Sequence, residues 1–341
     1  IRRQEFTGPA FPSGKLDIES FRQLFVGVKF YHDKSYYVVI SIYQLIIFLA
    51  TSCKYLSLIL YLLVEFSCQF LQIKSRPGKD KLSMPDNNPV AIIGMGCLFP
   101  KSTGLKEYWK LLYHGRDAIT EVPDSHWSPA DYYDTNPKTP DHVYCKRGGF
   151  LEPISFDPSE FGIPPSSLEA TDTSQLLGLL AAKMALEDCG YGNGRDFDRD
   201  RTSVILGVTG TQELVIPLSS RLSHPRWRKA LEDSAIPPAK TEEIIQKISD
   251  SFIPWQENSC PGLLGNVVAG RISNRLDLRG TNCVVDAACA CSLSAIHLAT
   301  LELITGRCDM VVTGGVDTLN DIFMHMCFSK THTLSATGDT R

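Results

Sequence analysis

Beyond Met84, hydrophobic residues fall into short runs that alternate with amphipathic stretches. The short runs are rich in valine and isoleucine and are bounded by glycine or charged residues, which predicts buried strands over 89–97, 202–207 and 309–315 and from Asn282 onward. The longer stretches carry apolar residues at helical spacing, which predicts helices over 105–113, 174–189, 226–235, 241–252, 262–276 and 292–304. Strands that are apolar throughout and alternate with helices predict an α/β fold whose sheet is covered on both faces.

The N-terminal part of the chain has a different pattern. Residues 35–53 form a 19-residue run without a charged side chain, and after one lysine the charge-free pattern continues to Val64. About 20 apolar residues are enough to cross a bilayer as a helix. The apolar run 35–64 therefore has two open interpretations: a transmembrane helix, or translated upstream sequence with Met84 as the true start. We expect an atypical segment over 1–83 and a globular domain over 84–341.

Composition adds limits on function. Of the 341 residues, 43% are hydrophobic and 21% are charged, and the net charge is −4, which is ordinary for a globular protein and disfavours nucleic-acid binding. The 11 cysteines are scattered and never spaced as C-x-x-C, which disfavours a metal site. An odd number of cysteines spread through apolar segments fits a reducing compartment, so we expect 84–341 to be cytoplasmic, with membrane association only through 35–64.

A turn of small residues separates the strand that begins at Asn282 from the helix that follows it. Residues 287–291 have the sequence AACAC, and Cys289 is directly ahead of the predicted helix. A strand that turns sharply into a helix through small residues exposes one side chain at the turn. The unpaired N–H groups and partial positive charge of a helix N-terminus favour a thiolate there. The pattern predicts a nucleophilic Cys289, with a small buried structural cysteine as the alternative.

Five motifs in order give 84–341 its resemblance to β-ketoacyl synthases. Residues 286–293, DAACACSL, resemble the nucleophile motif of that family. The other matching segments are the opening strand over 89–100, then 105–109 with 117–123, the helix over 266–272, and 306–317. More particular stretches over 144–150, 173–177 and 254–266 resemble the ketosynthase of polyunsaturated fatty acid synthases, with an iterative polyketide or glycolipid synthase as the alternative.

The resemblance implies a thiolase-like α/β fold, a five-layer α/β/α/β/α sandwich that forms a homodimer. This chain would supply its first half, with the second missing at the C-terminus, so that 84–341 is a truncated β-ketoacyl synthase N-terminal domain. By the same resemblance, Cys289 accepts an acyl chain, with its own backbone N–H in the oxyanion hole. Structural roles at the site are implied for Asp286, Ala288, Ser292, Asn266 and Arg271.

The implied reaction joins two thioesters. After Cys289 is acylated, a malonyl group on an acyl carrier protein loses carbon dioxide, and its enolate attacks the acyl-cysteine to give a 3-oxoacyl chain. The domain would bind no cofactor or metal itself, because phosphopantetheine arrives on the carrier protein. Cys291, where the family usually has serine or glycine, is expected to have a packing role.

One departure from the family pattern limits the expected activity. Family members use two histidines, in H-G-T-G-T and N-x-G-H motifs, and none of the eight histidines here lies in either motif. His297, eight residues after Cys289, is expected to be a packing residue. We therefore expect the fragment alone to be inactive in condensation. The alternatives are a thiolase-superfamily acyltransferase without a carrier protein and a non-catalytic, membrane-associated ketosynthase-like protein.

Overall fold

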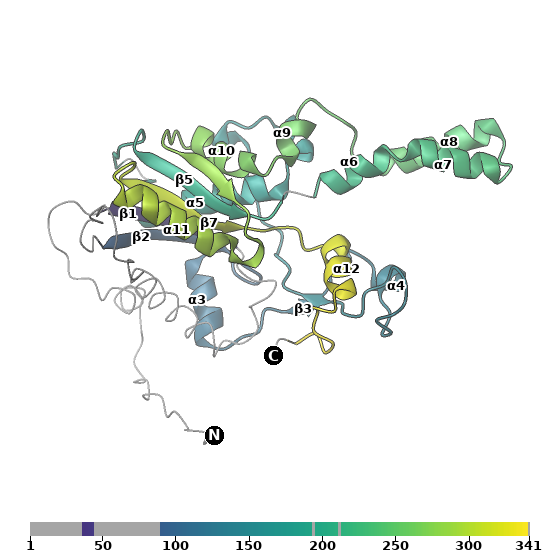
Figure 1. Cartoon of the computed structure of the whole chain (residues 1–341), viewed down its shortest axis with the longest axis horizontal. Coiled ribbons are helices and arrows are strands. Elements are labelled where there is room, and N and C mark those ends of the chain that lie inside the picture. Colours follow the sequence, from purple (N-terminus) through teal and green to yellow (C-terminus); the bar gives the residue numbers. More distant parts are fainter. Residues whose placement is uncertain (1–35, 44–88, 193–194, 211–212, 340–341) are drawn as a thin grey trace, which may run out of the picture. The chain divides into compact units, whose positions relative to one another are not determined.

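The computed structural model describes residues 36–43, 89–192, 195–210 and 213–339 (Figure 1). In chain order the strands and α-helices are β1 (Tyr36–Tyr43), β2 (Val90–Leu98), α3 (Leu105–Tyr113), β3 (Thr120–Glu121), α4 (Pro129–Tyr132), β4 (Arg147–Gly148), α5 (Thr173–Asp188), β5 (Thr202–Val208), α6 (Val215–Arg221), α7 (His224–Asp233), α8 (Pro238–Asp250), α9 (Ser259–Leu263), α10 (Asn266–Arg275), β6 (Asn282–Val285), α11 (Cys291–Ile304), β7 (Met310–Val316) and α12 (Ile322–Lys330). Short 3₁₀ turns cover Ser159–Phe161, Pro165–Ala170 and Ala288–Ala290.

The main sheet has five parallel strands in the order β2-β1-β7-β5-β6, and β3 and β4 form a separate antiparallel pair. In the register of the sheet, Gly207 near the end of β5 pairs with both Val285 of β6 and Gly315 of β7. The carboxyl ends of these three strands therefore meet at one edge. In open parallel sheets this is the edge where functional groups gather.

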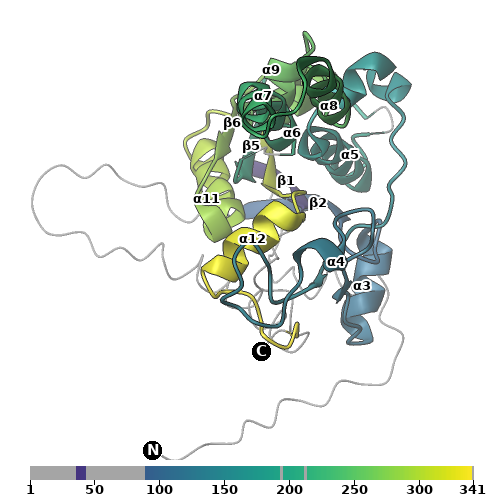
Figure 2. The ribbon, with the colours of Figure 1, turned by 90° about the vertical axis from the view of Figure 1, so that its right-hand side faces the viewer.

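Helices cover both faces of the sheet, as the sequence predicts. Side chains alternate along β5, so Val204 and Leu206 pack into a core with α5 and α10, whereas Ile205 packs with Ala295 and Ala299 of α11. Figure 2 shows α5 and α11 on opposite sides of the strands. The described residues thus form a helix–sheet–helix arrangement with α11 as the cover on the side opposite α5.

The predicted strands and most predicted helices are present, but the helix expected over 262–276 is broken in two. Leu264 has an extended backbone, with φ −85° and ψ 123°, and separates α9 from α10. Gly262 packs so closely that a Cβ atom there would lie 1.7 Å from the carbonyl oxygen of Ala170. This long-range contact leaves no trace in the apolar periodicity, so sequence alone merges the two helices. The helices α4, α6 and α12 and the strand pair β3–β4 are further elements that the pattern did not predict.

The strand β1 lies within the segment 1–83 that the sequence sets apart. Its backbone pairs with β2 along Tyr36–Tyr43 and with β7 from Tyr37 to Ile42. These eight residues of the apolar run 35–64 are therefore a strand rather than part of a membrane helix, and the sheet crosses the boundary expected at residue 84. The rest of that run, and Met84, lie outside the described residues. Within the described ranges, none of the helices combines the length and apolar character needed to span a bilayer.

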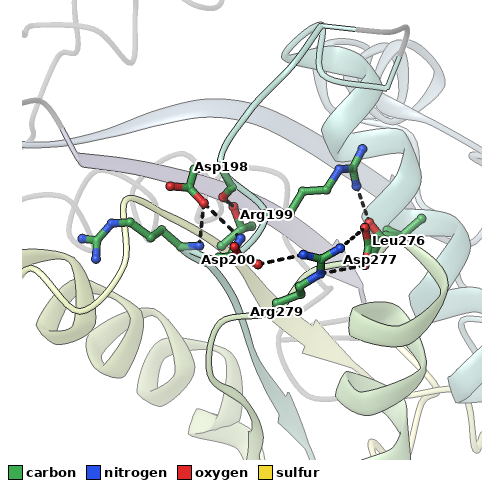
Figure 3. Close-up of polar contacts among 8 residues, drawn as sticks. Asp198, Arg199, Asp200, Leu276, Asp277 and Arg279 are labelled. Carbon is green, nitrogen blue, oxygen red and sulfur yellow. Dashed lines mark hydrogen bonds and ion pairs between the residues drawn. The ribbon is translucent and has the colours of Figure 1, made fainter.

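A polar network at the amino ends of the strands joins the loop before β5 to the turn between α10 and β6 (Figure 3). Arg199 donates to the carbonyl oxygen of Leu276 at 2.5 Å, and Arg279 pairs with Asp277 and Asp200, each at 3.0 Å. The Arg279 pairs are exposed, so each contributes little to stability. The network holds the edge of the sheet opposite the carboxyl ends of β5, β6 and β7.

Candidate active site

The strand–turn–helix geometry predicted around Cys289 is present. After Val285 ends β6, the chain turns through Ala288–Ala290, and α11 begins at Cys291. Ala288 has φ +48°, a left-handed conformation that is uncommon for a residue with a Cβ atom and that bends the backbone sharply. Cys289 follows directly and is exposed, whereas Cys291 is buried. The turn therefore presents one of the two thiols to solvent.

A small set of polar contacts fixes this turn. Oδ1 of Asp286 accepts the backbone N–H of Ala288 at 3.0 Å and the hydroxyl of Thr209 at 3.2 Å. The sulfur of Cys291 accepts the backbone N–H of Ala287 at 3.0 Å and lies 3.0 Å from Oγ1 of Thr209. The expected structural role of Asp286 thus has a geometric basis. Cys291 does more than pack, because its sulfur is a hydrogen-bond partner within the turn.

The start of α11 sits directly on the end of β5. A Cβ atom added to Gly207 would lie 2.4 Å from the carbonyl carbon of Cys291 and 2.7 Å from its oxygen. Only a residue without a side chain allows this approach. Gly207 and Thr209, both on or just after β5, were missed by sequence reasoning, since their contacts join positions about 80 residues apart in the chain.

The remaining predicted site residues are not all brought to the turn. Ala288 forms it, and Ser292 is half-buried in the first turn of α11. Asn266 is exposed at the start of α10. Arg271 lies between α10 and α5, where its Nε–H donates to Oε1 of Gln175 at 2.9 Å. His297, expected to be a packing residue, is instead exposed on α11 because its side of the helix faces away from the sheet.

The described cysteines range from buried through half-buried, as for Cys189 and Cys283, to exposed. Burial raises the pKa of Cys97 to about 12, and it also raises the pKa of Cys189, Cys283 and Cys308 above the ordinary thiol value. Among the described residues, the exposed cysteines are Cys260, Cys289 and Cys327. Buried thiols with raised pKa values are inert toward electrophiles.

Two carboxyl groups, the buried Asp172 and the half-buried Asp317, lie at the same edge of the sheet and were not predicted from the sequence. Asp172 caps α5 by accepting the N–H of Ser174 at 3.0 Å, and its other oxygen is buried without a hydrogen-bond partner. Asp317 directly follows β7. Burial, together with the nearby charge of Asp172, raises the pKa of Asp317 to about 6. Burial, opposed by the Ser174 hydrogen bonds and reinforced by the charge of Glu213, raises the pKa of Asp172 as well.

This pair predicts an unusual pH dependence of stability. An unfolded aspartate loses its proton near pH 3.8, whereas folded Asp317 holds it to about pH 6. The unfolded state then binds fewer protons between these values, so stability falls as the pH rises through this window. Asp317→Asn should raise the free energy of unfolding by about 2–3 kcal/mol at pH 7 and by little at pH 4. Urea denaturation at both pH values checks this, with the exposed-site variant Asp131→Asn as control; an equal gain at pH 4 and pH 7 would rule out titration as the cause.

Comparisons with known proteins agree on one family. A model of the family "Beta-ketoacyl synthase, N-terminal domain" matches residues 87–341. A polyunsaturated fatty acid synthase chain of Thraustochytrium sp. is 38% identical over 252 residues, which are 74% of this chain and 9% of that protein. Polyketide synthase PksN of Bacillus subtilis is 32% identical over 251 residues, which are 73% of this chain and 4% of that protein. The chain therefore spans less than a tenth of the length of these two relatives.

Solved structures confirm the predicted α/β, thiolase-like fold. The ketosynthase from module 6 of the bacillaene synthase of Bacillus subtilis aligns with a TM-score of 0.56 and 30% identity, covering 72% of this chain and 35% of that one. A ketosynthase domain of the Streptomyces albus oxazolomycin synthase aligns with a TM-score of 0.57 and 25% identity, covering 73% and 38%. On the family match, the relatives and the fold together, the chain belongs to the β-ketoacyl synthase family, within its N-terminal domain.

Proposed function

We propose that this chain carries the acyl-loading half of a ketosynthase active site, with Cys289 as the nucleophile. The observation that carries the proposal is an exposed thiol at the tip of a turn that Asp286, Thr209 and Cys291 hold in place. The thiol stands directly before the 14-residue helix α11. The partial positive charge of a helix N-terminus stabilises a thiolate, which is the attacking species.

The proposed loading step is a thioester exchange. The Cys289 thiolate attacks the carbonyl carbon of an acyl-phosphopantetheine thioester, and the backbone N–H of Cys289 donates to the developing oxyanion. The new S–C bond forms as the bond to the phosphopantetheine sulfur breaks, and that sulfur leaves as a thiolate that takes a proton from solvent. The chain needs no cofactor of its own for this step, because phosphopantetheine comes with an acyl carrier protein.

The second step, decarboxylative condensation with a malonyl thioester, is proposed to need protein outside this chain. The two histidine motifs of the family are absent from the sequence. The side of α11 that faces away from the sheet carries three leucines, Leu293, Leu298 and Leu301, which are 39%, 36% and 38% exposed, beside the exposed His297. Exposed apolar groups gathered on one helix face are typical of a surface that packs against further structure. This face supports the proposal that the complete domain packs further structure against α11.

Partners follow from the same proposal. Among the described strands, β6 is the last in the sheet, and one side of its backbone pairs with none of them. Edge strands readily pair with another chain, so we propose a homodimer through the ketosynthase domain. Acyl and malonyl thioesters on a carrier protein are the proposed substrates, in the cytoplasm. The 38% identity with a polyunsaturated fatty acid synthase, against 32% with a polyketide synthase, supports the fatty-acid branch.

Incubation of the chain with an acyl-phosphopantetheine carrier protein, followed by intact-mass spectrometry, tests the proposed division of labour. We expect the mass of one acyl group to be added to the chain, and we expect no 3-oxoacyl product when malonyl carrier protein is then supplied. Formation of that product by this chain alone would contradict the proposal that condensation needs further residues.

Alkylation with iodoacetamide should also distinguish Cys289 from the other thiols. Cys327 is exposed in the second half of α12 and controls for access alone, whereas Cys260 is exposed in the first turn of the five-residue helix α9 and controls for a short helix start. We expect Cys289 to be alkylated at least about tenfold faster than either, since its thiol stands at the tip of the turn, directly ahead of the unpaired N–H groups of the 14-residue helix α11. Peptide mass spectrometry over a time course gives the three rates, and equal rates would show that Cys289 is merely accessible.

A further inference from the structure

Two arginines on α10 line a pocket that is separate from the turn around Cys289. Arg271 and Arg275 are one helical turn apart, and the pocket between α10 and the segment before α5 has a volume of about 270 Å³. Ile163, Ser167, Thr171 and Asn258 form much of its remaining wall. Among the described residues, no carboxylate forms an ion pair with either arginine. Two positive charges therefore share a concave site without a negative partner.

The first arginine is held in place by a buried amide. Gln175 is fully buried, accepts the Nε–H of Arg271 at 2.9 Å, and donates to the carbonyl oxygens of Pro261 and Gly262, each at 2.9 Å. This fixes the orientation of the guanidinium plane and uses one of its five N–H donors. Both terminal nitrogens remain for a ligand, and a guanidinium fork that is already oriented loses less entropy on binding.

The other polar groups of the wall do not neutralise the arginines. The hydroxyls of Ser167 and Thr171 each donate to a backbone carbonyl at 2.7 Å and so are committed within the chain. Burial, and then the positive charge of Arg275, lowers the pKa of Arg271. The two guanidinium charges therefore repel each other, and the charge of Arg271 has lost part of its hydration. A bound anion would offset both the lost hydration and the repulsion.

We propose that the Arg271–Arg275 pocket binds a phosphate-type oxyanion, either inorganic phosphate or the phosphoester end of a small ligand. Guanidinium groups present parallel N–H donors whose spacing matches two oxygens of a phosphate. The volume admits a phosphate group with room for an attached chain. This site is independent of acyl loading, because none of its residues contacts the turn that presents Cys289 within the hydrogen bonds described.

The test is isothermal titration of the full chain with inorganic phosphate, at constant ionic strength in chloride. We expect saturable one-site binding that is weakened about tenfold or more in Arg275→Gln, because a hydrogen bond to a charged group is lost. Arg275→Lys keeps the charge but not the planar pair of N–H donors, so its affinity for phosphate should lie between those of the parent and Arg275→Gln. Arg226→Gln, which changes an exposed arginine on the helix α7, should bind as the parent does. Since Arg275 is exposed, its variants should unfold at the parental temperature.

A parallel titration identifies the source of the oxyanion. If coenzyme A displaces inorganic phosphate and pantetheine does not, the ligand is a phosphoester; if neither displaces it, the ligand is the free anion. Absence of saturable phosphate binding, or equal affinity in the parent and Arg275→Gln, overturns the proposal. Because the readout is phosphate binding, failure here leaves acyl loading on Cys289 untouched, and failure of acyl loading leaves this site untouched.

Discussion

Replacing Cys289 with alanine is expected to lower the rate of acyl transfer to the chain by at least about a thousandfold, because removal of a covalent nucleophile eliminates the reaction path rather than one stabilising contact. The side chain is exposed and is not among the groups whose hydrogen bonds hold the turn. The variant should therefore fold normally. Intact-mass spectrometry after incubation with an acyl carrier thioester measures the loss.

Two matched variants separate the nucleophile from its neighbours. Cys260→Ala removes another exposed thiol and should leave loading unchanged. Cys291→Ser keeps a group that can accept the N–H of Ala287 and meet Thr209, so loading should fall by far less than in Cys289→Ala. If Cys289→Ala loads acyl groups at the parental rate while Cys291→Ser does not, the assignment of the two cysteines is reversed.

Gly207→Ala should lower the free energy of unfolding by about 1–3 kcal/mol, because the new methyl group has no room beside the backbone of Cys291. The closest atom would be 2.4 Å away and belongs to the main chain, which cannot rotate aside as a side chain can. Relief requires the start of α11 to move off β5. Since the same turn presents Cys289, acyl loading should slow as well, even where the variant remains folded.

Urea denaturation measures the stability change, and Gly265→Ala is the matched control. Gly265 has ordinary helical backbone angles, and a Cβ atom there would meet nothing within 4 Å. This control should unfold within about 0.5 kcal/mol of the parent. Parental stability in Gly207→Ala would show that β5 and α11 are not in such close contact.

The sequence predicted the parts of the fold that depend on local pattern. Apolar, β-branched runs became β2, β5 and β7, and the small residues between β6 and α11 became the sharp turn that exposes Cys289. These features follow from neighbours in the chain, since the strand period, the helix period and the small volume of alanine are visible within a few residues. The turn and its exposed cysteine can therefore be located from the amino-acid sequence, and the proposed role of Cys289 as nucleophile rests on that position together with the resemblance to the family.

Features that depend on distant segments could not be predicted in the same way. Beside the break between α9 and α10, Gly262 packs against Ala170 of another segment, and the partners of the turn include Thr209, far from Cys289 in the chain. The raised pKa of Asp317 arises because the fold buries it near Asp172. In each case the decisive group is supplied by another element, so no periodicity or motif signals it.

The central claim is that Cys289 is the thiol that accepts the acyl group, and its most direct test locates that group. After the chain is incubated with an acyl carrier thioester and digested, tandem mass spectrometry can separate Cys289 from Cys291 within one peptide. We predict the acyl group on Cys289, with Cys291, Cys260 and Cys327 unmodified. An acyl group found mainly on Cys260 or Cys327, or spread equally over the exposed thiols, would contradict the claim.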